Sequence, residues 1–238
     1  MVDSRIIENN LETIAENIEQ ACQRSQRKSK DITLVAVSKK QPLEKMIAYQ
    51  EICQKLGRKV VFGENYVQEF KEKKEKLSGI YESHLIGALQ RNKAKDAFTG
   101  FDIIESVHSS ALLLELEKVG KKLGLVKNIF LQVNISEDDG KSGFSVAEVK
   151  DIFGNEISKL SNLRVIGLMT VTKLYDNAKL VRPDFVAFRK LRDELNEIES
   201  GKKQSLSLSM GMSDDYIEAV EEGADFIRIG TALFGERN

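Results

Sequence analysis

The residue whose position most directly suggests chemistry is Lys39, which ends an apolar run. The run covers residues 32–39, reads Ile-Thr-Leu-Val-Ala-Val-Ser-Lys, and is broken soon afterwards by Pro42. A parallel strand buried on both faces shows such a continuous run, so we predict an amine at the carboxyl end of a buried strand. In a barrel of parallel strands, the βα loops converge at that end and carry the chemistry. The alternative is a strand that ends in a solvated lysine.

Small residues near the C-terminus form a candidate phosphate site. Ser209 lies in the stretch Leu-Ser-Met-Gly-Met-Ser, and Gly230 and Thr231 follow the run Phe-Ile-Arg-Ile. At the ends of the last two strands of a barrel, small residues let backbone N–H groups approach a phosphate, and hydroxyl groups add donors. The alternative is a turn that leads into a helix, with Ser213 as the N-cap.

Arg228 is a charge inside an apolar strand. It alternates with Ile227 and Ile229, so its side chain points to the opposite face from theirs. The inward face of a late barrel strand is packed core, where a guanidinium requires a partner that accepts its hydrogen bonds. The structural alternative is a buried ion pair with a carboxylate. The functional interpretation is an arginine that donates to a ring nitrogen or an anionic group of a ligand.

Polar residues also mark the second and third predicted strands. Glu64 and Asn65 follow Val-Val-Phe-Gly, at the same rim as Lys39, where Asn65 can donate to a ligand oxygen and Glu64 can pair with a cation. The alternative for both is the start of a helix. His84 lies at the start of the third strand, so we predict a buried, hydrogen-bonded histidine and not a catalytic one.

Composition narrows the classes of function. The sequence has 36 Lys and Arg against 37 Asp and Glu, which gives no global bias toward nucleic acid or an anionic membrane. Cys22 and Cys53 form no CxxC or Cys/His cluster and no metal motif is present, so we expect reduced core thiols and no metal. No secretion signal or long apolar run is found. We therefore expect a cytoplasmic protein that binds a small molecule and no membrane.

Eight strand-like segments alternate with amphipathic helices. The predicted strands are residues 32–39, 60–63, 83–87, 102–106, 128–135, 164–171, 204–210 and 226–230, and the predicted helices are 4–26, 43–56, 66–77, 110–123, 146–160, 184–199 and 214–222, with a polar helix beginning at 90–93. Eight βα units predict a (β/α)₈ TIM barrel with an extra N-terminal helix that can cover its floor. Since no linker or repeat divides the chain, we expect residues 1–238 to form a single domain.

Several blocks of this sequence, in order along nearly the whole chain, closely resemble the pyridoxal 5′-phosphate (PLP) homeostasis proteins. The blocks are Leu34–Lys39, Phe62–Glu69, His84–Lys93, Gln132–Ser136, Gly167–Thr170, Leu208–Asp215 and Arg228–Thr231. The sequence departs from the family at Lys40, where threonine is common, and at Ser83, where tryptophan is frequent. Neither departure touches the residues expected to contact PLP.

The resemblance implies a barrel similar to the N-terminal domain of alanine racemase, with PLP joined to Lys39 as a Schiff base. It also implies that Arg228 faces the pyridine nitrogen and that Asn65 lies beside the cofactor. Ser209, Gly230 and Thr231 are then expected to bind the phosphate. A partly desolvated lysine near other cations has a lowered pKa, and its neutral amine attacks an aldehyde.

Three functions are compatible with these residues. The first is a PLP carrier or homeostasis protein with little or no turnover, a monomer that passes PLP to apoenzymes. The second is a PLP-dependent amino-acid racemase, which uses a second acid/base from a C-terminal β-domain. Since this sequence ends at Asn238, soon after the last strand, we expect that domain to be missing and favour the carrier. The third is a barrel enzyme that acts on a phosphorylated metabolite without PLP.

Overall fold

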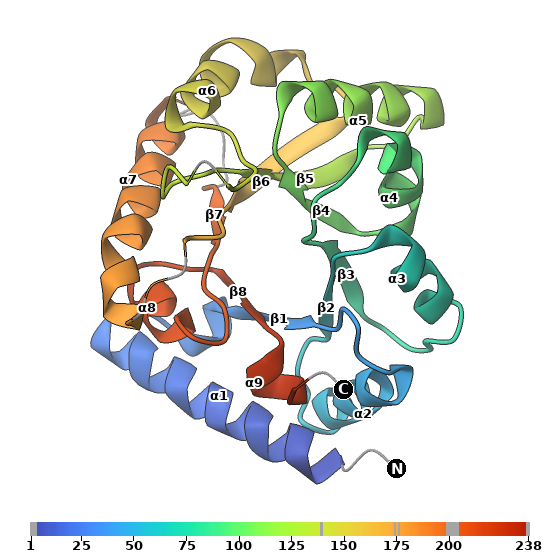
Figure 1. The fold of residues 1–238 in the computed structure, drawn as a ribbon, viewed down its shortest axis with the longest axis vertical. Helices are drawn as coiled ribbons and strands as arrows, with labels where there is room; N and C mark the ends of the chain where they lie inside the picture. The colour runs from blue at the N-terminus through green and yellow to red at the C-terminus, as the bar shows by residue number, and fades with distance from the viewer. Residues whose placement is uncertain (1–3, 139, 174, 176, 199–204, 237–238) are drawn as a thin grey trace.

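The eight predicted strands form a closed, parallel barrel in the computed structural model (Figure 1). The structure describes residues 4–138, 140–173, 175, 177–198 and 205–236. The strands are β1 (Thr33–Val37), β2 (Val61–Glu64), β3 (Glu82–Leu85), β4 (Ile103–Val107), β5 (Lys127–Gln132), β6 (Leu163–Met169), β7 (Ser207–Ser209) and β8 (Phe226–Ile229). Each strand pairs with the next, and β8 closes the barrel on β1. The predicted (β/α)₈ barrel is confirmed.

Helices surround the ring of strands (Figure 1). They are α1 (Ser4–Arg24), α2 (Leu43–Lys55), α3 (Val67–Lys74), α4 (Ala94–Gly100), α5 (Ser110–Leu123), α6 (Val146–Asp151), α7 (Arg182–Ile198), α8 (Tyr216–Glu221) and α9 (Thr231–Phe234). Among the described residues, no helix combines the length and the apolarity needed to cross a membrane.

The strand and helix predictions differ from the structure mainly at their ends. The predicted strand 128–135 stops at Gln132, and the predicted strand 204–210 begins at a residue outside the described part of the chain. The predicted helix 146–160 ends as an α-helix at Asp151 and continues as a π turn and a 3₁₀ turn. Gly and Asn in that turn have low helix propensity, which favours the change. The short helix α9 is absent from the sequence-based predictions.

The strands separate two cores. The outer core lies between the strands and the helices, and its largest buried side chains include Tyr49, Phe62, Phe70, Phe98, Phe185 and Phe188. The inner core is a small cluster inside the barrel, formed by Ile103, Phe130 and Met169 with Phe226 packed against it. Both cysteines lie in the outer core as free, buried thiols, as predicted.

Helix α1 lies along the outside of the ring and does not cross the floor (Figure 1). It packs against α2, α8 and α9, with Ile7, Leu11, Ile14 and Ile18 buried on one face. The Asn17 amide donates to the Tyr216 hydroxyl of α8 at 2.8 Å. Helix α9 has only four residues, and α1 packs against it on the outside of the barrel.

Candidate functional site at the barrel mouth

Lys39 lies in the turn that follows β1, at the mouth of the barrel. Ala36 packs in the outer core, while a Cβ on Gly63 would meet Val35 and a Cβ on Gly230 would meet Val37. Because side chains alternate along a strand, Val35 and Val37 lie on the inward side, and Lys39 follows them in the turn after β1. Its side chain is half-buried, whereas Lys40 is exposed and has a φ of 56°. The two adjacent lysines therefore differ in burial and in backbone conformation.

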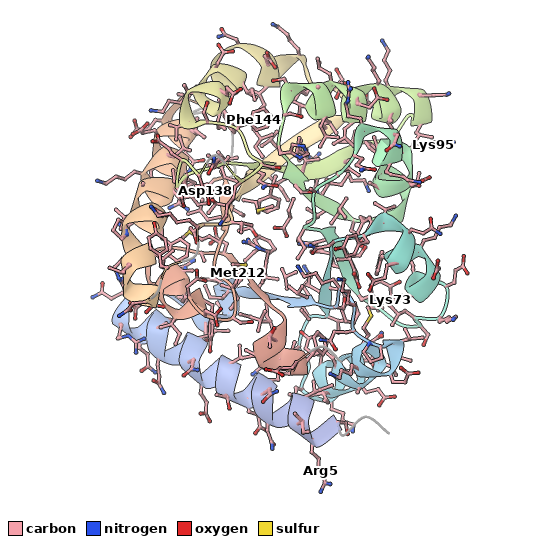
Figure 2. The ribbon with its side chains drawn as sticks, in the orientation of Figure 1. Arg5, Lys73, Lys95, Asp138, Phe144 and Met212 are labelled. Atoms are coloured by element: carbon pink, nitrogen blue, oxygen red, sulfur yellow. The ribbon has the colours of Figure 1, made fainter. Side chains whose placement is uncertain are left out.

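A cluster of charges behind β1 holds the turn that carries Lys39. Lys73, labelled in Figure 2, extends from α3 and donates to the Ser38 carbonyl at 2.7 Å and to Glu64 Oε1 at 2.9 Å. The Ser38 hydroxyl also donates to Glu64, and Glu69 accepts from both Lys73 and the Lys40 backbone N–H. Burial raises the pKa of Glu64, and Lys73 opposes that effect. Glu64 thus pairs with a cation, as predicted, and lies on the outer side.

Asn65 follows β2 and is pressed against Gly87 after β3. A Cβ on Gly87 would lie 2.5 Å from Asn65 Cα, so only glycine permits this approach. The residue that flanks the start of α3 is Tyr66, so Asn65 does not cap that helix. Within the described part of the chain, its buried Oδ1 has no hydrogen-bond partner. A buried acceptor without a donor is costly, and a ligand hydroxyl placed here would satisfy it.

Arg228 lies inside the barrel and is only 4% exposed. Its Nη2 donates to the Thr170 carbonyl at 2.6 Å and its Nη1 donates to the Ser209 hydroxyl at 2.7 Å. Burial lowers the pKa of Arg228, and the nearby carboxylates of Glu105 and Asp215 oppose that effect. Arg228 on β8 pairs in register with Val35 on β1, so it lies on the strand next to the one that leads to Lys39.

The Ser209 hydroxyl belongs to the inner network. It donates to Glu105 Oε2 at 2.5 Å while it accepts from Arg228. A serine hydroxyl has a single proton, so this hydrogen is directed at Glu105 and not at the mouth. The predicted contact between this hydroxyl and a phosphate is therefore not supported by its orientation.

Ser213 lies beside the start of α9 and not at the start of α8. The structure shows α8 starting at Tyr216, flanked by Asp215, so the alternative of an N-cap at Ser213 is wrong. Instead, the Ser213 hydroxyl accepts from the Ala232 N–H at 3.4 Å, beside the turn formed by Gly230 and Thr231. Gly211, with a φ of 90°, permits this loop because a Cβ there would meet Ala219 at 2.5 Å. Ser213 joins Gly230 and Thr231 at one place on the mouth.

Two further charges complete the inner network. His84 is fully buried, as predicted, and its ring contacts Glu105 at 2.5 Å and Glu82 at 2.8 Å. Burial alone lowers the pKa of His84, but the bonds to both carboxylates raise it to about 9. The same contacts lower the pKa of Glu105. Sequence reasoning missed Glu105, although a charge inside the run Ile-Ile-Glu-Ser-Val is the same signal that identified Arg228.

Comparisons with known proteins identify the class. The family "Alanine racemase, N-terminal domain" matches residues 9–238. A "Pyridoxal phosphate homeostasis protein" of Aquifex aeolicus is 37% identical over 95% of this chain and 96% of its own length, and that of Escherichia coli is 31% identical over 98% and 97%. The chain belongs to the pyridoxal phosphate homeostasis protein family, whose barrel is that of the racemase N-terminal domain.

Solved structures agree with that assignment. The structure of PipY from Synechococcus elongatus "with PLP bound" is 35% identical, covers 93% of this chain and all of its own, and has a TM-score of 0.79. Alanine racemase from Bartonella henselae has a TM-score of 0.71 at 15% identity, and this chain covers 60% of that chain. The second likeness shows the fold alone.

Proposed function

We propose that this protein binds PLP in the barrel mouth, with the Lys39 amine joined to its aldehyde carbon with loss of water. The observation that carries the proposal is the convergence of Lys39, Arg228 and the turn at Gly230 on neighbouring strands at one end of the barrel. In parallel barrels this end is where ligands bind. The PLP bound by the similar PipY protein supports the same ligand here.

The residues at the mouth suit the chemical groups of PLP. PLP supplies a reactive aldehyde, a phenolic hydroxyl, an electron-accepting pyridine ring and a phosphate. The buried Asn65 Oδ1, which has no partner among the described residues, suits the phenolic hydroxyl. Arg228 suits the ring nitrogen. Gly230 and Thr231, with Ser213 beside them, suit the phosphate, whereas Ser209 acts through Arg228.

We further propose that the protein holds PLP with little or no catalytic turnover. An arginine keeps its positive charge at neutral pH, so Arg228 disfavours protonation of a ring nitrogen that lies beside it. That weakens the ring as an acceptor of electrons, which most PLP enzymes exploit. The homeostasis names of the relatives support this role. In this proposal the protein is a cytoplasmic monomer that gives PLP to apoenzymes.

The first experiment tests the covalent site. Purified protein with PLP is reduced with borohydride, and the modified peptide is identified by mass spectrometry. Lys39→Ala should lose the visible absorbance and the trapped adduct, while the matched control Lys40→Ala, at the exposed neighbouring residue, should keep both. An adduct that persists in Lys39→Ala would assign the covalent bond to another amine. A colourless protein that takes up no PLP would favour the barrel enzyme without PLP.

The second experiment tests turnover, because the family name of the matching domain keeps a racemase as the competing function. The PLP-loaded protein is incubated with L-alanine and other amino acids while α-proton exchange and chirality are followed. We expect no turnover in the ordinary enzyme range of about 1–10³ per second. Racemisation at several per second or more would replace the carrier role with a racemase.

A further inference from the structure

A chain of buried polar groups crosses the inside of the barrel from the start of β3 to the mouth. It runs from Glu82 to His84, then to Glu105 at 2.5 Å, to the Ser209 hydroxyl at 2.5 Å and to Arg228 at 2.7 Å. His84, Glu105 and Ser209 are each 0% exposed. Four different strands, β3, β4, β7 and β8, supply these five groups, so the chain ties together opposite parts of the barrel wall.

Glu105 sets the direction of the two hydrogen bonds that it makes in this chain. An ionised carboxylate can only accept, so the Ser209 proton must point toward Glu105, and the Ser209 oxygen then presents its lone pairs to Arg228. His84 donates to the other oxygen of Glu105 and keeps the carboxylate in its ionised form. A group at position 105 that could also donate would compete with Arg228 for the lone pairs of the Ser209 oxygen and would take away the acceptor of the Ser209 proton. The hydrogen bond from Arg228 to Ser209 would then be weakened.

We propose that Glu105 and His84 are positioning residues, which fix through Ser209 where the Arg228 guanidinium lies at the barrel mouth. The inference rests on the proposed function, in which Arg228 faces the ring of PLP. Neither residue touches the ligand in this scheme. The second acceptor of Arg228, the Thr170 carbonyl, is a backbone group and cannot reorient in this way, so the side-chain arm is the adjustable one.

The competing interpretation is a network that only stabilises the fold. Binding of two ligands distinguishes the positioning role from the purely structural one. The ligands are PLP and pyridoxal, which share the ring and differ in the phosphate. An effect transmitted to the ring through Arg228 lowers the affinity for both ligands by the same factor. An effect on the phosphate site lowers the affinity for PLP only. A loss of stability alone changes neither affinity at temperatures well below unfolding.

The experiment uses Glu105→Gln, which keeps the size of the side chain and adds a donor, and Ser209→Ala, which removes the link without changing charge. Each should weaken both ligands by roughly tenfold, the effect of losing one charge-assisted hydrogen bond. Each should also shift the visible absorption maximum of bound PLP. In an Arg228→Leu background, Glu105→Gln should have no further effect on pyridoxal affinity, since its action passes through the missing guanidinium.

The matched control is Asp102→Asn, at the start of the same β3–β4 pair. Asp102 accepts from the Ser83 hydroxyl at 2.7 Å, as Glu105 accepts from Ser209, but Ser83 precedes His84 and lies on the other face of β3. This control should keep the wild-type affinities and absorption maximum. Thr231→Val is the phosphate-side comparison and should weaken PLP but not pyridoxal.

Two results would overturn the inference while leaving the proposed function intact. The first is a folded Glu105→Gln or Ser209→Ala protein with wild-type affinity for both ligands and an unchanged absorption maximum. The second is a loss confined to PLP in Ser209→Ala, which would place that hydroxyl on the phosphate. Failure of the proposed function looks different, because wild-type protein would then bind no PLP or would form its adduct away from Lys39.

Discussion

The two sides of the barrel wall are built on different principles. Outside the strands, large apolar side chains such as Phe62, Phe185 and Phe188 are almost completely buried against the helices. Inside, a small apolar cluster lies beside a chain of charged and hydroxyl groups that includes His84 and Arg228. Inside the barrel, the apolar cluster and the polar chain meet at Phe226, whose ring is 5.7 Å from that of His84 and 5.5 Å from that of Phe130.

This difference separates stability from function. Burial of apolar area on the outside contributes free energy of folding in proportion to area and tolerates swaps that conserve volume. A buried charge network contributes little net stability but is costly to break, because the partner that remains is left unpaired. Changes to the outer core should therefore alter stability and spare the site, whereas changes to the inner network should alter both.

The largest effect should come from the outer core. Phe188→Ala on α7 removes a side chain that is 0% exposed and leaves a cavity, which should lower the free energy of unfolding by about 3–5 kcal/mol. Chemical denaturation measures this loss. PLP affinity at low temperature should remain as in the wild type. A parallel loss of affinity would show that the outer and inner regions are energetically coupled.

The inner network should give the next largest effect, and it should depend on pH. The pKa of His84 is about 9 in the folded protein and 6.5 in an unfolded chain, so its stabilising contribution is complete below pH 6.5 and is lost as the pH rises through 9. At about 1.36 kcal/mol per pKa unit, this shift corresponds to a loss of about 3 kcal/mol in the free energy of unfolding. Comparing unfolding of the wild type with His84→Asn across this window isolates the contribution. A stability difference that stays constant from pH 6 to pH 10 would contradict it.

Much of this architecture could be predicted from the sequence because periodicity reports burial. The continuous apolar run before Lys39 and the isolated charge at Arg228 both report a strand buried on two faces. The partners of Arg228 could not be found in the same way. Ser209 and Glu105 lie on β7 and β4, and the closure of the barrel, which no local pattern encodes, brings them to the guanidinium.

A smaller effect should follow from Gly87→Ala. The added Cβ would meet the backbone of Asn65, so either residue must shift, at a cost of about 1–3 kcal/mol. Because Asn65 lies at the mouth, PLP affinity should fall together with stability, as we expect for changes to the inner network. Gly100→Ala at the end of α4 is the matched control, since its φ is not positive and a Cβ there meets no atom within 4 Å. Equal affinity in both variants would exclude Asn65 from the site.

The smallest effect should come from Lys45→Met. Lys45 of α2 donates to the Phe234 carbonyl at the end of α9 at 2.6 Å, which ties the outer layer to the helix that begins at Thr231. Loss of this hydrogen bond should cost about 1 kcal/mol and weaken PLP severalfold, with pyridoxal unaffected. Isothermal titration with the two ligands measures the difference. Equal weakening of both would place this tie on the ring side of the site.

The loop between β7 and α8 is the part of the site for which the sequence-based assignment of the helix start differs from the structure. A helix cap at Ser213 is the alternative to the phosphate site because serine is favoured at caps, yet Asp215 takes the position at the start of α8 and accepts from the Met212 N–H. Several Ser and Asp residues in a row offer competing caps, and propensity alone does not choose between them. The Ser213 hydroxyl instead accepts from Ala232 of α9, and that contact depends on the closed barrel.

The position of α1 has a consequence for protein synthesis. Its apolar stripe packs against α2, α8 and α9, of which the last two come late in the sequence, and the hydrogen bond between Asn17 and Tyr216 joins residues 199 apart. At typical translation rates of about 5–20 residues per second, the ribosome takes roughly 10–40 s to produce the cover for a helix made first. During that time the nascent chain exposes Ile7, Leu11 and Ile14, a segment on which a chaperone could act.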